Sequence, residues 1–221
     1  LRLVGMEGAK KTVIMGRSTT ATPEEIAAGE FVNGRCGKGA LRCVGSRLQY
    51  AVVQGFTLTG GATDADPKTR NNAYGASKGK TNDCDTVAAY NWMASGICGS
   101  SYSAGVITLR CRDCIISNNV AYRASAAASL MLERTVVTGN DSADMNAETN
   151  KITTVGGAVF DCGLADLIVN GNHTTVSPYF PSTVFMRSSV GAIFHSIIAE
   201  SEQNALNGAD AYLYNSVVYN S

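Results

Sequence analysis

Five short segments of the chain share one order of polar and apolar positions. In each segment, a polar residue at the second position is followed by a small or apolar residue and then by two aliphatic residues. Alternation of this kind over a few residues is typical of a short β-strand with one buried side. The segments are 112–119, 133–140, 165–172, 194–201 and 214–221, and 54–61 fits the same frame.

The spacing of these segments indicates a repeat. The equivalent residues Ile116, Val137, Val169, Ile198 and Val218 follow one another after 21, 32, 29 and 20 residues. A unit of about 20 residues cannot bury its own apolar side, so such units stack on one another. The repeat therefore predicts an all-β solenoid of about seven coils with loop insertions, whose equivalent strands are parallel neighbours about 4.7–4.9 Å apart.

Strand alternation assigns a direction to each side chain of the repeat. The five equivalent aliphatic residues are expected to point inward. So are the residues two positions before them, Cys114, Thr135, Leu167, Ser196 and Ser216. The residues in between form an outward apolar column, Ile115, Val136, Ile168, Ile197 and Val217. This column is covered either by loops of the protein or a further segment, or by a binding partner.

Shorter patterns place the remaining elements within a single domain, 1–221. Strands are expected at 11–16 and 39–44, and each coil carries a second strand and a third, less regular one. Residues 22–29 begin with a Thr cap, Pro and Glu, which predicts a short helix. Residues 62–103 are polar and lack the repeat, so they are expected to form a long loop insertion. Because both ends of the chain fall within strand patterns, we expect a fragment of a longer chain.

Charge and hydropathy exclude two classes of partner. The 18 Lys and Arg residues balance 18 Asp and Glu residues, so the formal net charge is zero and no basic footprint for nucleic acid is visible. No stretch approaches the roughly 18 uninterrupted apolar residues of a transmembrane helix. We therefore expect neither nucleic-acid binding nor a membrane span.

The seven cysteines are an odd number, so they cannot all pair within the chain. Cys111 and Cys114 form a C-x-x-C pair, a spacing used in redox and zinc sites. Because no second pair exists and the chain has only two His, we interpret both as small buried apolar side chains. Cys84 and Cys98 lie in the insertion, where a disulfide would indicate an oxidising compartment.

Motifs along the chain indicate a family. They are Leu-Val-Gly at 3–5, Lys-Thr-Val-Ile at 11–14, Gly-Phe-Thr-Leu-Thr-Gly-Gly at 55–61, Asp-Cys-Ile-Ile-Ser-Asn at 113–118 and Gly-Gly-Ala-Val-Phe at 156–160. This series resembles right-handed parallel β-helix repeat proteins of the pectate-lyase-like superfamily, particularly secreted or surface-anchored bacterial members. The resemblance covers most of the chain outside the insertions. It implies a right-handed parallel β-helix but no single activity, because lyases, hydrolases and adhesins all use such repeats.

The polar residues at the second position of the repeat are the first candidate site. If the register holds, Asp113, Arg134, Asp166 and His195 lie one coil apart on an accessible edge. Carboxylate, guanidinium and imidazole groups this close could bind a sugar acid or perform acid–base catalysis. Alternatively, they are turn residues whose exposed ion pairs contribute little.

The insertion carries a second set of candidates. Lyases of this superfamily commonly abstract the proton α to a uronate carboxylate with Arg or Lys, often with Ca²⁺ held by acidic side chains. The matching residues would be Asp64, Asp66, Lys68 and Arg70, with Asp83 and Asp85 further along. They show no fixed metal-ligand spacing, so solvated loop charges are the simpler interpretation. We assign no catalytic residue, metal ligand or cofactor, and we expect Ca²⁺ only if the protein is a lyase.

Asparagines recur near the ends of the repeats and predict amide ladders at the bends. They are Asn118, Asn119, Asn140, Asn170, Asn172 and Asn220.

Together these features favour a secreted or cell-surface β-helix module that binds a polysaccharide, a cell-surface glycan or another surface, in an adhesin-type or structural role. The alternative is a polysaccharide lyase or related carbohydrate-active enzyme that acts on acidic polysaccharide, with the insertion as one wall of its cleft. A stacked fold could also contact another protein end to end or side by side.

Overall fold

The computed structural model describes the parts of the chain that carry the repeat. All elements in these parts are β-strands. The helix expected at 22–29, Cys84 and most of the insertion 62–103 lie outside the described residues. The described residues are 1–18, 41–45, 50–62, 96–98, 109–121, 125–128, 130–143, 158–160, 162–175, 182–186, 191–200, 204–208 and 211–220.

Two parallel sheets of seven strands each carry the repeat. The first sheet holds the strands that precede the polar second position, and the second sheet holds the strands that follow it. The first sheet consists of β1 (Arg2–Val4), β4 (Ala51–Gln54), β7 (Leu109–Arg112), β11 (Met131–Glu133), β15 (Gly163–Ala165), β19 (Gly191–Phe194) and β22 (Ala211–Tyr214). The second consists of β2 (Val13–Met15), β5 (Thr57–Thr59), β8 (Ile115–Ser117), β12 (Val136–Thr138), β16 (Ile168–Asn170), β20 (Ile197–Glu200) and β23 (Val217–Asn220).

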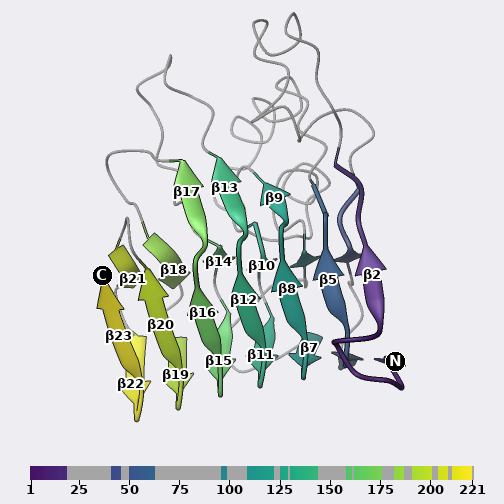
Figure 1. Cartoon of the computed structure of the whole chain (residues 1–221). Coiled ribbons are helices and arrows are strands. Elements are labelled where there is room, and N and C mark those ends of the chain that lie inside the picture. Colours follow the sequence, from purple (N-terminus) through teal and green to yellow (C-terminus); the bar gives the residue numbers. More distant parts are fainter. Residues whose placement is uncertain are drawn as a thin grey trace, which may run out of the picture.

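The register of the second sheet confirms the stacking predicted from the repeat. Ile116 pairs with Val137, Val137 with Val169, Val169 with Ile198, and Ile198 with Val218. No step is shifted, although insertions of different length separate the strands along the chain. Figure 1 shows these strands side by side in chain order, with the two termini at opposite ends of the row.

Two further parallel sheets lie between the second sheet and the return of the chain to the first; the third takes part in six passes and the fourth in three, among the residues described. The strands of the third sheet are the third, less regular strands that the sequence predicted for each coil. The fourth sheet has three strands, which the sequence did not predict. The third sheet holds β3 (Val44–Gly45), β6 (Ile97–Cys98), β10 (Ala127–Ala128), β14 (Val159–Phe160), β18 (Ser182–Met186) and β21 (Asn204–Gly208). The fourth holds β9 (Val120–Ala121), β13 (Asp141–Ala143) and β17 (His173–Thr175). Of the strand expected at 39–44, residues 39–40 lie outside the described residues, and among residues 41–45 the strand is β3 (Val44–Gly45).

The chain visits the sheets in a fixed order. Each strand inside a sheet pairs with its equivalents from the passes before and after it, and the strands at the two ends of a sheet pair on one side. All nineteen strand pairings described are parallel. Parallel strands need long connections between them, and here the connections are the strands of the other sheets. This all-β arrangement is compatible with a parallel β-helix.

The core lies between the sheets and consists of the side chains that alternation turns inward. Leu58, Ile116, Val137, Val169 and Ile198 are fully buried in one column. The outward neighbours of these residues are partly or largely exposed, which confirms their predicted outward direction; Ile168, Ile197 and Val217 are among the exposed apolar residues, so the described residues do not provide the expected cover over this part of the column. The alternation of the sequence therefore fixes which side of each strand faces solvent.

Candidate functional site

The polar second position of the repeat is a bend between the first and second sheets. Asp113 lies between β7 and β8, and Arg134 lies between β11 and β12. Each residue at this position has a positive φ, in the left-handed region that glycine adopts most readily. The bend residues and their φ angles are Gly55 (77°), Asp113 (51°), Arg134 (46°), Asp166 (55°), His195 (46°) and Asn215 (46°). We call these six residues the bend column.

Backbone hydrogen bonds hold the bend column in register. The Asp113 N–H donates to the carbonyl of Glu133 at 3.1 Å, and the Arg134 N–H donates to the carbonyl of Ala165 at 2.9 Å. The His195 N–H makes the equivalent bond to the next pass at 3.0 Å. Because each bend from Gly55 to His195 bonds to the pass that follows it, the side chains of the column project from the same edge about one strand spacing apart.

At four of the six bends, the next residue closes the bend from the inside. Its side chain donates a hydrogen bond to the carbonyl two residues earlier, as Thr135 Oγ1 does to Glu133 at 2.9 Å, Ser196 Oγ to Phe194 at 2.7 Å and Ser216 Oγ to Tyr214 at 3.0 Å. Cys114 Sγ makes the same contact to Arg112 at 3.0 Å. These bonds satisfy carbonyls at the end of a strand, as Ser and Thr commonly do at turns. The Cys114 thiol therefore occupies the place of a hydroxyl.

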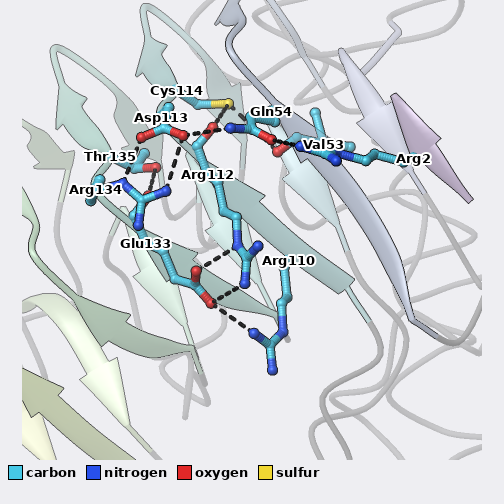
Figure 2. Close-up of polar contacts among 10 residues, drawn as sticks. All are labelled: Arg2, Val53, Gln54, Arg110, Arg112, Asp113, Cys114, Glu133, Arg134 and Thr135. Carbon is cyan, nitrogen blue, oxygen red and sulfur yellow. Dashed lines mark hydrogen bonds and ion pairs between the residues drawn. The ribbon is translucent and has the colours of Figure 1, made fainter. Parts of the chain in front are cut away.

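The first two charged members of the bend column form a two-bonded ion pair. Arg134 Nε donates to Asp113 Oδ1 at 2.7 Å, and Arg134 Nη2 donates to Asp113 Oδ2 at 3.0 Å. Gln54 Nε2 also donates to Asp113 Oδ2, at 2.8 Å, and Arg2 in turn donates to Gln54. Figure 2 shows this polar chain crossing from β1 and β4 to the bends after β7 and β11.

These contacts shift the titration of the pair. The side-chain hydrogen bond from Arg134, aided by the one from Gln54, holds the pKa of Asp113 below its ordinary value. The same hydrogen bond raises the pKa of Arg134. Both side chains remain partly open to solvent, so the pair is screened and contributes little to stability.

A second ion cluster lies on the outer face of the first sheet, on the strand residues that precede the bends at Asp113 and Arg134. Arg110 Nη1 lies 3.3 Å from Glu133 Oε1, and Arg112 Nε lies 2.5 Å from Glu133 Oε2. The two guanidinium groups come from β7 and the carboxylate comes from β11, so they converge across one strand spacing (Figure 2). The Glu133 carboxylate is the most buried of the three groups.

The other two candidates of the column also lie next to each other. His195 Nδ1 is 3.5 Å from Asp166 Oδ1, and both side chains are more than half exposed. The His195 ring lies 5.9 Å from the Tyr214 ring, measured between centroids. Thus the register brings the four predicted column residues into two neighbouring pairs, Asp113 with Arg134 and Asp166 with His195.

A second set of bends follows the second sheet and differs in its side chains. These bends also have positive φ, but the residues are Gly60 (68°), Asn118 (54°), Gly139 (63°) and Gly171 (58°). Glycine and asparagine are the residues that tolerate this conformation best. We call these residues the glycine bends.

A buried amide ladder follows the glycine bends. Asn119 Nδ2 donates to Asn140 Oδ1 at 2.9 Å, and Asn140 Nδ2 donates to Asn172 Oδ1 at 2.9 Å. Asn140 Nδ2 also lies 2.9 Å from the Ile116 carbonyl, and Asn140 Oδ1 accepts the Asn119 N–H at 3.1 Å. The predicted amide ladder is confirmed for these three asparagines. Asn118 and Asn170 are instead exposed, and the side chain of Asn220 lies outside the described residues.

The C-x-x-C pair is buried and reduced. Cys111 and Cys114 are free thiols in the core, as expected for small apolar side chains. The hydrogen bond with Cys114, together with burial, raises the pKa of Cys111 well above its ordinary value. No three His, Cys, Asp or Glu residues among those described come together to hold a metal ion. The proposed Cys84–Cys98 disulfide involves a residue outside the described parts.

The insertion candidates cannot be related to the bend column, because Asp64, Asp66, Lys68 and Arg70 lie outside the described residues. Conversely, sequence reasoning missed Gln54, which hydrogen-bonds to Asp113, and the ion cluster of Arg112 and Glu133 beside the column. Each of these residues is the last one of its strand, directly before a bend. Strand alternation turns the three side chains outward, next to the bend column: Gln54, Arg112 and Glu133. The available signal was their position in the repeat, one residue before the column.

The chain matches no known family model, no curated protein and no solved structure. Among the strands and bends described, no helix is long and apolar enough to cross a membrane. Relationships to other proteins therefore depend on the sequence motifs and on the stacked parallel strands.

Proposed function

We propose that this chain is a right-handed parallel β-helix of the pectate-lyase-like kind, and that it acts outside the cell or at its surface as a glycan-binding module. The bend column is the proposed binding edge. The parallel register of the sheets and the motifs in the sequence support the fold, and the chemistry of the column supports the function.

One comparison within the molecule carries the proposal. The glycine bends and the bend column both require a positive φ, which costs a non-glycine residue roughly 1–2 kcal/mol. The glycine bends avoid this cost with Gly or Asn. The bend column instead uses Asp, Arg, Asp and His at four consecutive passes, and Arg134 is an unusual residue for this conformation. Strained residues with functional side chains are typical of binding sites.

The groups of the column suit a polysaccharide. Carboxylate, guanidinium and imidazole groups supply both donors and acceptors for sugar hydroxyls, and a guanidinium can bind a carboxylate through two parallel bonds. The groups repeat at each pass, so a chain-like ligand lying along the stack would meet a new set at each strand spacing. Binding at several weak positions along one ligand chain then raises the overall affinity.

The test is retention of the protein by polysaccharides in affinity electrophoresis, with a panel of neutral polymers (amylose, xylan, galactomannan) and one acidic polymer (polygalacturonate). We expect retardation by at least one polymer and at least tenfold weaker binding in the double variant Asp113→Gly, Arg134→Gly. Glycine keeps the bend conformation, so the fold is retained. The matched control is Arg17→Gln, which removes an exposed cation that follows β2, at the opposite end of the second sheet from the column.

Retardation that is unchanged in the double variant, for every polymer that binds, would show that Asp113 and Arg134 are not part of the binding edge. Absence of retardation by every polymer in the panel would contradict the proposed glycan-binding function itself.

A further inference from the structure

The outer face of the first sheet changes character along the stack. At its charged end, the residues just before the bends are Arg112 and Glu133. The equivalent residue on β15 is Ala165, which pairs in register with Phe194 on β19, and Phe194 pairs with Tyr214 on β22. The face therefore passes from ions, across a small side chain, to aromatic rings.

The aromatic end is open to solvent. Phe194 is 42% exposed, Tyr212 69% and Tyr214 58%. The Phe194 and Tyr214 ring centroids lie 6.2 Å apart with an interplanar angle of 58°, so the rings touch without stacking on each other's faces. We call these three residues the aromatic patch. It leaves ring surface in water that a ligand can cover.

Polar groups border this patch on the bend side. His195 and Asp166 lie 3.5 Å apart, and the His195 ring is 5.9 Å from Tyr214. The pair thus places a hydrogen-bond acceptor and an imidazole beside an apolar ring. Two other described ionisable groups lie beside this pair on the same edge. One is the Tyr214 hydroxyl, and the other is Arg134, one pass before Asp166. The Arg134 guanidinium is bonded to Asp113.

We propose that the aromatic patch, with His195 and Asp166, is a subsite for an uncharged pyranose residue of a polysaccharide. This inference rests on the proposed function and assigns the ligand class of one part of the site. A pyranose presents one face of C–H bonds, whose positive edges match the negative faces of aromatic rings. Its hydroxyls lie around the rim of the ring, where they can donate to Asp166 and bond to His195.

Charge makes the subsite selective. A uronate carboxylate placed here would lie beside the Asp166 carboxylate, which is unfavourable. Acidic sugars would instead bind near Arg110, Arg112 and Arg134 at the other end of the face. Stacking and neutral hydrogen bonds depend little on ionic strength, whereas binding through the arginines weakens as salt is added.

The experiment is affinity electrophoresis and calorimetry of the full chain with the same polymers at low and high NaCl. We expect binding of at least one neutral polymer with less than a twofold change between the two salt concentrations. Tyr214→Ala and Phe194→Ala should each weaken it roughly tenfold, and Tyr214→Phe should preserve it, because the ring is retained. The matched control is Tyr219→Ala, an exposed tyrosine on the second sheet, which should bind as the wild type does.

Three results would overturn the inference. If only polygalacturonate binds, in a salt-sensitive manner that the aromatic variants do not affect, the bend column binds glycans and the aromatic subsite is wrong. If neutral polymers bind equally well in Tyr214→Ala, Phe194→Ala and Tyr219→Ala, the patch is not their subsite. Binding of no polymer would overturn both this inference and the proposed function. Circular dichroism confirms that each variant is folded.

Discussion

At the scale of single residues, the bends with positive φ show which residues serve the backbone alone and which also add a functional group. A bend of this kind needs only a backbone conformation, and glycine supplies it without a side chain, as Gly139 does. Asp113 and Arg134 meet the same backbone requirement but add a paired carboxylate and guanidinium. The choice of residue therefore says more about the surface than about the fold.

The Asp113 carboxyl gives a pH-dependent prediction. Its pKa is lower in the folded state than in the unfolded state, so its contribution to the free energy of unfolding is present above the unfolded-state pKa. That contribution is lost as the pH falls through the folded-state pKa. Arg134→Gln should raise the pKa of Asp113 toward its ordinary value, because the largest cause of the shift is the Arg134 hydrogen bond.

Carbon-detected NMR titration of the Asp113 carboxyl measures this change. The matched control is Arg110→Gln, since Arg110 contacts Glu133 and not Asp113. If Arg110→Gln changed the pKa of Asp113 more than Arg134→Gln does, Arg134 would not be the main cause of the lowered pKa. Because both partners are partly exposed, the loss of stability in Arg134→Gln should be small, about 0.2–1 kcal/mol.

At the scale of elements, each pass is joined to its neighbours by backbone hydrogen bonds and by the amide ladder. Asn140 lies in the middle of that ladder and is fully buried. It serves the Ile116 carbonyl, the Asn119 backbone and side chain, and Asn172 at once. The ladder thus joins three successive passes of the chain through side-chain hydrogen bonds, in addition to the backbone hydrogen bonds between their strands.

Asn140→Ala should lower the free energy of unfolding by about 2–4 kcal/mol, because the buried Asn119 N–H and Ile116 carbonyl lose a partner. Urea denaturation measures this loss. Asn170→Ala is the matched control: Asn170 is exposed on β16, and its replacement should change stability by less than about 0.5 kcal/mol. Equal effects of the two substitutions would contradict the ladder.

The elements also show what the sequence could predict. The alternation around Ile116 and its equivalents predicted the second sheet, its register and its inward column, because burial of one side imposes a period of two. The column of Asp113, Arg134, Asp166 and His195 was predictable for the same reason. The ion cluster around Glu133 was not predictable in this way. The repeat indicates that its side chains point outward, but burial does not restrict which outward polar side chains pair with each other.

At the scale of the whole molecule, stacking in register unites fold and proposed function. The core column, the amide ladder and the bend column each draw one residue from successive passes of the chain, and the aromatic patch joins two neighbouring passes, β19 and β22. A shift of one residue in any strand would turn inward side chains outward and break the columns. The proposed sites therefore exist only if the passes follow one another as the strand order states.

Methyl–methyl nuclear Overhauser effects among Ile116, Val137, Val169, Ile198 and Val218 test this stacking most directly. With selectively labelled methyl groups, each residue should show strong effects to its immediate neighbours in that order, about 4.7–4.9 Å away by strand spacing. Effects between alternate members, at about twice that spacing, should be much weaker. Strong effects that skip neighbours, or none along the series, would contradict the stacked arrangement and the sites that depend on it.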